Sequence, residues 1–188
     1  LLKIIAGAGL SLLSAQDPFE LDSALTNAIP RSISNSIQIA DLNNDGYNDI
    51  ILSGYDPTRF GLFIDVMLGS GDGTLSQGYQ TYFVTYSDTI AEYLGGIGSI
   101  SLADVNLDGS IDIYINGSAQ SKLLFNSSSG SFSESSWLQN MRVTYSNGKW
   151  GDVNMDGAPD LFLMGVNEST DQILNKLFIN NRNDFEND

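Results

Sequence analysis

The chain has 188 residues, with 23 acidic and 8 basic side chains, a net charge of −15, and neither His nor Cys. The negative charge disfavours binding to nucleic acids and direct membrane insertion. The absence of His and Cys excludes disulfide frameworks, thiol nucleophiles and the usual zinc sites. Because 41% of the residues are apolar and 10% are aromatic, we expect a folded chain whose acidic groups bind a cation.

The first 36 residues are open to two interpretations. Residues 1–15 combine a basic residue, an apolar run and small residues, which is typical of a signal peptide. Ile4–Gly7 also matches the later apolar segment Ile51–Gly54, so residues 1–36 can alternatively be interpreted as a partial copy of a repeat. The repeat is the favoured interpretation.

Three segments of nine residues share the pattern Asp-x-Asn-x-Asp-Gly-x-x-Asp, and we call residues 41–49, 104–112 and 152–160 loops 1, 2 and 3. Nine of the 18 Asp residues occupy positions 1, 5 and 9 of these loops. Calcium is a hard cation that takes six to eight oxygen ligands at roughly 2.3–2.6 Å. A curled loop would offer side-chain oxygens at positions 1, 3, 5 and 9 and a backbone carbonyl at position 7. Gly at position 6 permits the sharp turn.

The sequence therefore predicts three Ca²⁺ sites of one kind. Three carboxylates in one loop repel each other without a cation, so an empty loop should destabilise the fold. The candidate ligands are Asp41, Asn43, Asp45, Tyr47 and Asp49 in loop 1, Asp104, Asn106, Asp108, Ser110 and Asp112 in loop 2, and Asp152, Asn154, Asp156, Ala158 and Asp160 in loop 3.

Two other interpretations of the loops are less favoured. An Asp-Gly hairpin turn with local hydrogen bonds would explain a single copy, but agreement among three copies favours metal binding. An EF-hand needs an acidic ligand at position 12 and a helix on each side. Position 12 is apolar in every copy, where the residues are Leu52, Ile115 and Leu163. The segments on either side of each loop resemble strands instead of helices.

Short strands are predicted around each loop, because apolar and β-branched residues alternate there and stop at Gly or polar turns. The loops start 63 and then 48 residues apart, a period typical of propeller blades. The expected strands are 37–40 and 100–103 before loops 1 and 2, then 49–54, 112–117 and 160–165 directly after the three loops, and 62–68, 122–125 and 176–179 further on.

This pattern resembles the FG-GAP/VCBS repeat, the calcium-loop blade of integrin α-subunit propellers. The match is closest over Ile39–Gly54 and Val66–Leu75. The resemblance implies an all-β fold of about three to four four-stranded antiparallel blades, as part of a larger or multi-chain β-propeller. The expected units are a partial blade at 1–36, blades at 37–99 and 100–147, and an incomplete blade at 148–188.

The resemblance also implies a function. We expect a secreted or cell-surface module without enzymatic activity, in which structural calcium supports cell adhesion or the binding of an extracellular protein or glycan. The remaining blades, or another chain, are the expected structural partners. Three Asn-x-Ser motifs are candidate glycosylation sites, at Asn116, Asn126 and Asn167.

The alternative is the propeller domain of a secreted polysaccharide lyase or phospholipase. Catalysis would then depend on Tyr, Lys, Arg or acidic side chains, and the candidates are Asp88 and Glu92 with the nearby Tyr79, Tyr82 and Tyr86. A strand followed by a connection between blades explains this segment more simply, so no catalytic residue is predicted. Three further aromatic residues are expected in the core rather than as sugar-binding platforms: Trp137, Trp150 and Phe162.

Overall fold

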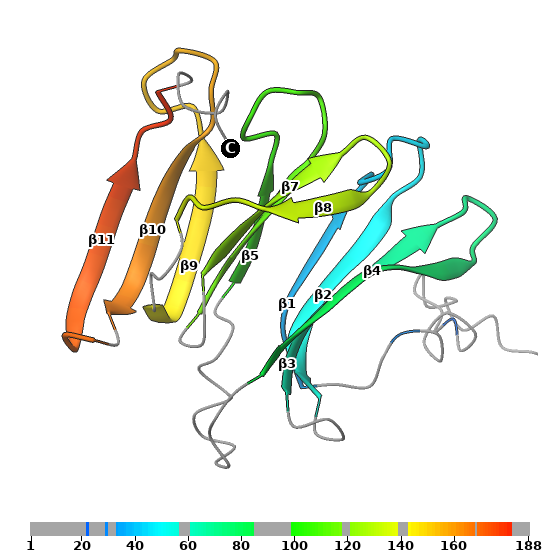
Figure 1. The fold of residues 1–188 in the computed structure, drawn as a ribbon, viewed down its shortest axis with the longest axis horizontal. Coiled ribbons are helices and arrows are strands. Elements are labelled where there is room, and N and C mark those ends of the chain that lie inside the picture. Colours follow the sequence, from blue (N-terminus) through cyan, green and yellow to red (C-terminus); the bar gives the residue numbers. More distant parts are fainter. Residues whose placement is uncertain are drawn as a thin grey trace, which may run out of the picture.

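The computed structural model describes residues 22, 29, 33–56, 61–84, 99–117, 121–138, 143–167 and 169–181. The regular secondary structure within these residues consists of strands alone, and the strands form three antiparallel sheets. Figure 1 shows the sheets side by side in chain order, like neighbouring blades of a propeller, and the described strands do not close a ring. The prediction of an all-β fold built from blades is confirmed.

Each sheet is formed from strands that follow one another in the chain. We call the three sheets the first, second and third blades. The first contains β1 (Ile33–Ala40), β2 (Asp49–Asp56), β3 (Gly61–Gly69) and β4 (Leu75–Val84); the second contains β5 (Ser99–Ala103), β6 (Asp112–Asn116), β7 (Lys122–Ser127) and β8 (Ser131–Glu134); the third contains β9 (Val143–Gly151), β10 (Asp160–Asn167) and β11 (Gln172–Phe178).

Each loop connects the first two strands of a blade in the same register. The last residue before the loop pairs with the Asp at position 9: Ala40 with Asp49, Ala103 with Asp112, and Gly151 with Asp160. The predicted strands are all present, and several are longer. Strand β1 begins at Ile33 instead of residue 37, and residues 1–15 lie outside the described residues.

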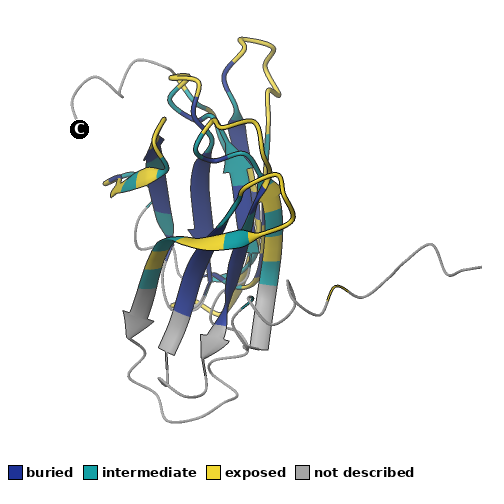
Figure 2. Cartoon of the chain, turned by 90° about the vertical axis from the view of Figure 1, so that its right-hand side faces the viewer, coloured by how far each residue is buried: buried dark blue, intermediate teal, exposed yellow. Residues whose placement is uncertain are grey.

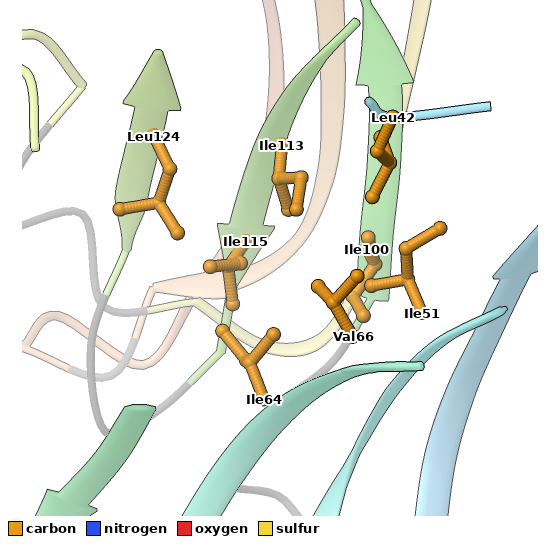
Figure 3. Close-up of a cluster of buried hydrophobic side chains, with 8 residues drawn as sticks. All are labelled: Leu42, Ile51, Ile64, Val66, Ile100, Ile113, Ile115 and Leu124. Atoms are coloured by element: carbon orange, nitrogen blue, oxygen red, sulfur yellow. The ribbon is translucent and has the colours of Figure 1, made fainter. Parts of the chain in front are cut away.

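The hydrophobic core lies between blades. Alternation along the second strand, counted from the start of the loop, sends position 11 of the first and second blades toward the following blade. It sends positions 10 and 12 of the second and third blades toward the preceding one. In the first interface Ile51, at position 11, belongs to one buried cluster with Ile113 and Ile115 of the second blade, and Figure 3 shows the side chains of this cluster gathered between the two blades. Many of the most deeply buried residues lie on the middle strands of the first two sheets, β2 and β3 and β6 and β7, and Figure 2 shows buried residues running along the strands.

The second interface follows the same rule. Tyr114, at position 11 of the second blade, packs with Leu161 of the third blade, at position 10. Trp150 meets Tyr114 edge to face, with ring centroids 5.9 Å apart. Trp137 and Trp150 both pack against this cluster, so their assignment to the core is confirmed. Phe162 was expected there too, and that prediction is wrong: its side chain is 44% exposed on the outer face of the third blade.

Hydrogen bonds from backbone N–H groups to Ser hydroxyls connect neighbouring blades. The N–H of Ile100 donates to the Ser36 hydroxyl (3.2 Å), and the N–H of Gly148 donates to the Ser99 hydroxyl (3.1 Å). Ser36 and Ser99 both lie five residues before their loop, and the two donors both lie four residues before theirs. The two interfaces therefore have the same register.

The buried phenol of Tyr114 predicts a loss of stability at alkaline pH. Burial raises its pKa from 10.0 to about 12, and the Ser121 hydroxyl offsets part of the rise. Because the folded state holds this proton more tightly than the unfolded state, stability is lost as the pH rises from about 10 to about 12, by about 2 kcal/mol. Urea unfolding at about pH 9 and about pH 11.5 should show a smaller alkaline loss in Tyr114→Phe than in the parent. An equal loss in both proteins would contradict this origin.

The described part of the chain contains no helix long and apolar enough to cross a membrane.

Candidate metal centres

Hydrogen bonds to its own backbone curl each loop. In loop 1 the Asp41 carboxylate accepts the N–H of Asp45 (3.1 Å) and of Gly46 (2.8 Å). The Asn43 side-chain oxygen accepts the same Asp45 N–H (3.2 Å), and the Asp45 carboxylate accepts the N–H of Tyr47 (2.8 Å). Loops 2 and 3 repeat all four bonds at the same positions, with distances of 2.8–3.1 Å.

These bonds bring the oxygens of positions 1, 3 and 5 together. The side chains at positions 1 and 3 both accept the backbone N–H of the Asp at position 5. The Asn amide at position 3 also donates to the carboxylate at position 5, at 2.9 Å in every loop. Three oxygen-bearing side chains therefore lie on one side of the curl. Ligation of a cation by these side chains stays a prediction.

Two positions in each loop have left-handed backbone geometry. Gly at position 6 has φ of 83–90°, as the sequence predicted. Position 4 is also left-handed, and this was not predicted because the residues there differ: Asn44 (57°), Leu107 (62°) and Met155 (62°). A non-Gly residue in this region costs about 1 kcal/mol, so the loop holds these residues by its other contacts.

The residue at position 7 varies in its surroundings. Ser110 and Ala158 are buried, whereas Tyr47 is half exposed. The Tyr47 ring lies against Gly71 in the turn between β3 and β4, so closely that a Cβ on Gly71 would overlap it. In that turn the Asp72 carboxylate accepts bonds from Ser70 and Thr74, which lower its pKa to about 2. The first loop is thus braced by a tight neighbouring turn.

The Asp at position 9 has a structural role that spacing alone did not reveal. It is buried in all three loops, and both its oxygens accept backbone N–H groups. In loop 1, Asp49 accepts the N–H of Leu42 at position 2 (2.8 Å) and of Gly69 at the end of β3 (2.9 Å). Asp112 and Asp160 make the equivalent pairs of bonds, to Val105 and Asn126 and to Val153 and Asn180. This Asp therefore clamps the loop to the third strand.

The clamp residue of loop 2 is electrostatically strained. Burial raises the pKa of the Asp112 carboxyl to about 6, against the lowering effect of the Asn126 and Val105 N–H groups, and the nearby Asp108 carboxylate adds to the rise. A cation beside these carboxylates would favour their ionised forms. The electrostatics of loop 2 are thus suited to a bound positive charge.

Loops 1 and 2 are each connected to the next blade by one Asn side chain. The Asn126 side chain donates to the carbonyl of Leu42 (2.6 Å), and the Asn180 side chain donates to the carbonyl of Val105 (2.9 Å). Leu42 and Val105 both occupy position 2 of the preceding loop, and both are buried. Because the same Asn residues also donate their backbone N–H to the clamp Asp, hydrogen bonds run unbroken from loop 1 to loop 3.

This arrangement bears on the glycosylation motifs. Asn116 and Asn126 are buried, and the Asn126 amide nitrogen donates to two carbonyls. An enclosed amide is not accessible for attachment of a glycan in the folded chain. Asn167 is less buried, and its side-chain oxygen accepts the N–H of Ser169 (2.9 Å).

The loops offer a donor set that fits calcium. Among the described ranges, no three acidic side chains already form a metal cage, because the loop carboxylates face backbone N–H groups. The gathered side chains at positions 1, 3 and 5 nevertheless carry only hard oxygen donors on their carboxylates and amide carbonyl, as calcium requires. Ligation of calcium by positions 1, 3, 5, 7 and 9 stays a prediction. Of the catalytic candidates, Tyr86, Asp88 and Glu92 lie outside the described residues.

The comparison with known families agrees with this geometry. A family model described as an FG-GAP-like repeat matches the chain twice, over residues 41–115 and 104–163, and the matches begin at the first Asp of loops 1 and 2. A search of curated proteins found no similar sequence. The two family matches together span residues 41–163, which is more than half of the chain. The chain belongs to the FG-GAP-like repeat family.

Proposed function

We propose that this chain is a calcium-binding module of an extracellular β-propeller. Calcium would have a structural role: it would stabilise the blades, whose surfaces bind a protein or glycan or mediate cell adhesion. The observation that carries the proposal is the identical set of hydrogen bonds in the three loops, which turns the oxygens of positions 1, 3 and 5 to one side. Asp41, Asp104 and Asp152 would begin the three sites. Bound calcium would supply the positive charge that offsets carboxylate repulsion.

The chemistry of calcium supports an extracellular location. Extracellular calcium modules often bind with dissociation constants of about 10⁻⁴–10⁻³ M, which suits millimolar free calcium. The excess of acidic over basic residues, 23 against 8, also favours a cation-rich medium.

Calcium titration of the chain by calorimetry tests the metal sites directly. We expect three ions per chain, and about two when Asp108→Ala disables loop 2. Asp171→Asn is the matched control, because it removes an exposed carboxylate from the turn between β10 and β11, outside the loops. Unchanged stoichiometry in Asp108→Ala would contradict the proposed site.

An open cleft beside loop 2 is where a ligand could approach such a site. The cleft has a volume of about 410 Å³, and its lining includes Asn106 and Asp108 of the loop together with Phe125 and Phe132 of the adjoining hairpin. Phe132 is held in place by Tyr79 of the first blade, with ring centroids 4.9 Å apart. Polar and aromatic groups side by side suit a glycan or a protein side chain.

Binding to arrays of immobilised glycans and matrix proteins tests the adhesive function. We expect at least one ligand to be retained in calcium and released by EGTA, and Phe132→Ala to weaken it if the cleft takes part. Calcium-dependent turnover of an acidic polysaccharide, without stable retention, would instead support the enzyme interpretation.

A further inference from the structure

The outer face of the third blade exposes the residues that are buried in the other two blades. At position 2 of the loops, Leu42 is 0% and Val105 4% exposed, but Val153 is 59% exposed. In Figure 1 the third blade stands at the left-hand end of the row, with no described strand beyond β11 on that side.

Two more positions show the same contrast. At position 11, Ile51 and Tyr114 are fully buried, whereas Phe162 is 44% exposed. Gly69, Asn126 and Asn180 donate their N–H to the clamp Asp of their own blade. Three residues before them on the third strand, Val66 and Leu123 are buried whereas Leu177 is 47% exposed. The exposed apolar residues thus match, position by position, the side chains that contact a following blade elsewhere.

The polar contacts of a following blade are also prepared. Ser36 and Ser99, five residues before their loops, accept an N–H from the next blade. Asn147 is the equivalent residue of the third blade, is exposed, and has a side-chain oxygen that can accept the same bond. The position-2 carbonyl, which accepts an Asn side chain in loops 1 and 2, belongs here to Val153.

We propose that this face, defined by Asn147, Val153, Phe162 and Leu177, is the docking surface for a further blade of the same repeat type. That blade would have apolar residues at positions 10 and 12 of its loop-exit strand and an Asn at the end of its third strand. The two interfaces already described set these requirements, because Ile113 and Ile115, like Leu161 and Leu163, are buried.

A second copy of this chain, docking through its first blade, does not meet the requirements. The third strand of that blade ends at Gly69, which has no side-chain amide to bond the Val153 carbonyl. Its corresponding face, with Leu52, Phe63 and Met67, already packs against Ile29. The occupant is therefore a blade that resembles the second or third.

The repeat register allows a direct test. Asn126 and Asn180 occupy the same position, so joining residues 1–180 to residues 127–188 adds a fourth strand to the third blade and a copy of the third blade after it, without a shift of register. In this extended chain the added Asn180 should bond Val153 of the original blade.

Val153→Asp distinguishes a docked blade from an attached tail. It should leave the melting temperature of the parent chain nearly unchanged, because the side chain is exposed, but lower that of the extended chain by about 5 °C or more. Replacing the added Asn180 by Ala should also lower it. Met155→Asp is the control, since Met155 is 92% exposed and lies outside the docking surface.

Two results would overturn the proposal. One is an equally small effect of Val153→Asp in both chains, whether or not the added unit folds. The other is a dimer of the parent chain in sedimentation that Val153→Asp dissociates and Met155→Asp does not, which would assign the face to a second copy. All measurements are made both in calcium and in EGTA, so failure of the calcium sites appears separately as a loss of calcium binding.

Discussion

Removal of calcium with EGTA should lower the melting temperature of the chain by more than about 10 °C. In about 10 mM calcium, a site with a dissociation constant of about 10⁻⁴ M is at 100 times its dissociation constant, and binding stabilises the fold by about 2.7 kcal/mol. Three such sites would supply about 8 kcal/mol, which is comparable to the whole stability of many domains. The loops lie beside both blade interfaces, so their loss should be felt throughout the described blades.

The double variant Asp45→Ala with Asp108→Ala isolates the metal contribution. Both side chains are exposed, so their removal should cost little stability in EGTA. In calcium the variant should melt well below the parent, with roughly one third of the parent's calcium-induced shift, because only loop 3 is intact. Calorimetric melting in both buffers measures this, with Asp171→Asn as the control for lost charge. A calcium-induced shift equal to that of the parent would show that loops 1 and 2 bind no calcium.

The second large effect is expected at position 9. Asp49→Ala removes a buried carboxylate and leaves the N–H groups of Leu42 and Gly69 without their acceptor. A buried donor left unsatisfied costs about 1–3 kcal/mol, so the variant should lose about 2–6 kcal/mol even without calcium. Asp45→Ala, in the same loop but exposed, is the matched control. Urea unfolding in EGTA should therefore separate the two variants.

The outcome that contradicts this role is equally clear. If Asp49→Ala and Asp45→Ala have the same stability in EGTA and differ only in calcium, position 9 acts as a metal ligand without a clamping role. Destabilisation of Asp49→Ala in both buffers would establish the clamp.

Local pattern was enough to predict the loops and strands. Asp, Asn and Gly at fixed spacing determine hydrogen bonds within nine residues, and these bonds are the same in all three loops. Alternation of apolar residues likewise identified the strands, although β1 extends back to Ile33 because Ser34 and Ser36 pair with β2 despite their polarity.

Contacts between blades were not predictable from the same signals. Phe162 has the sequence character of a core residue, but its exposure depends on what lies beyond the third blade. Asn126 was interpreted as a glycosylation motif, although it bonds Leu42, 84 residues away. One signal was present: Lys-Leu-x-x-Asn occurs at both 122–126 and 176–180, and each copy ends in an Asn that bonds the preceding loop.

The unbroken series of hydrogen bonds from Asp49 through Asn126 and Asn180 to Asp160 makes the described array a one-dimensional cooperative system. In such a system each unit gains stability only from its nearest neighbours. Loop 2 is held from both sides, whereas Val153 of loop 3 is exposed. Heating should therefore fray the structure from the third blade inward, and amide exchange should be fastest there and slowest around loop 2.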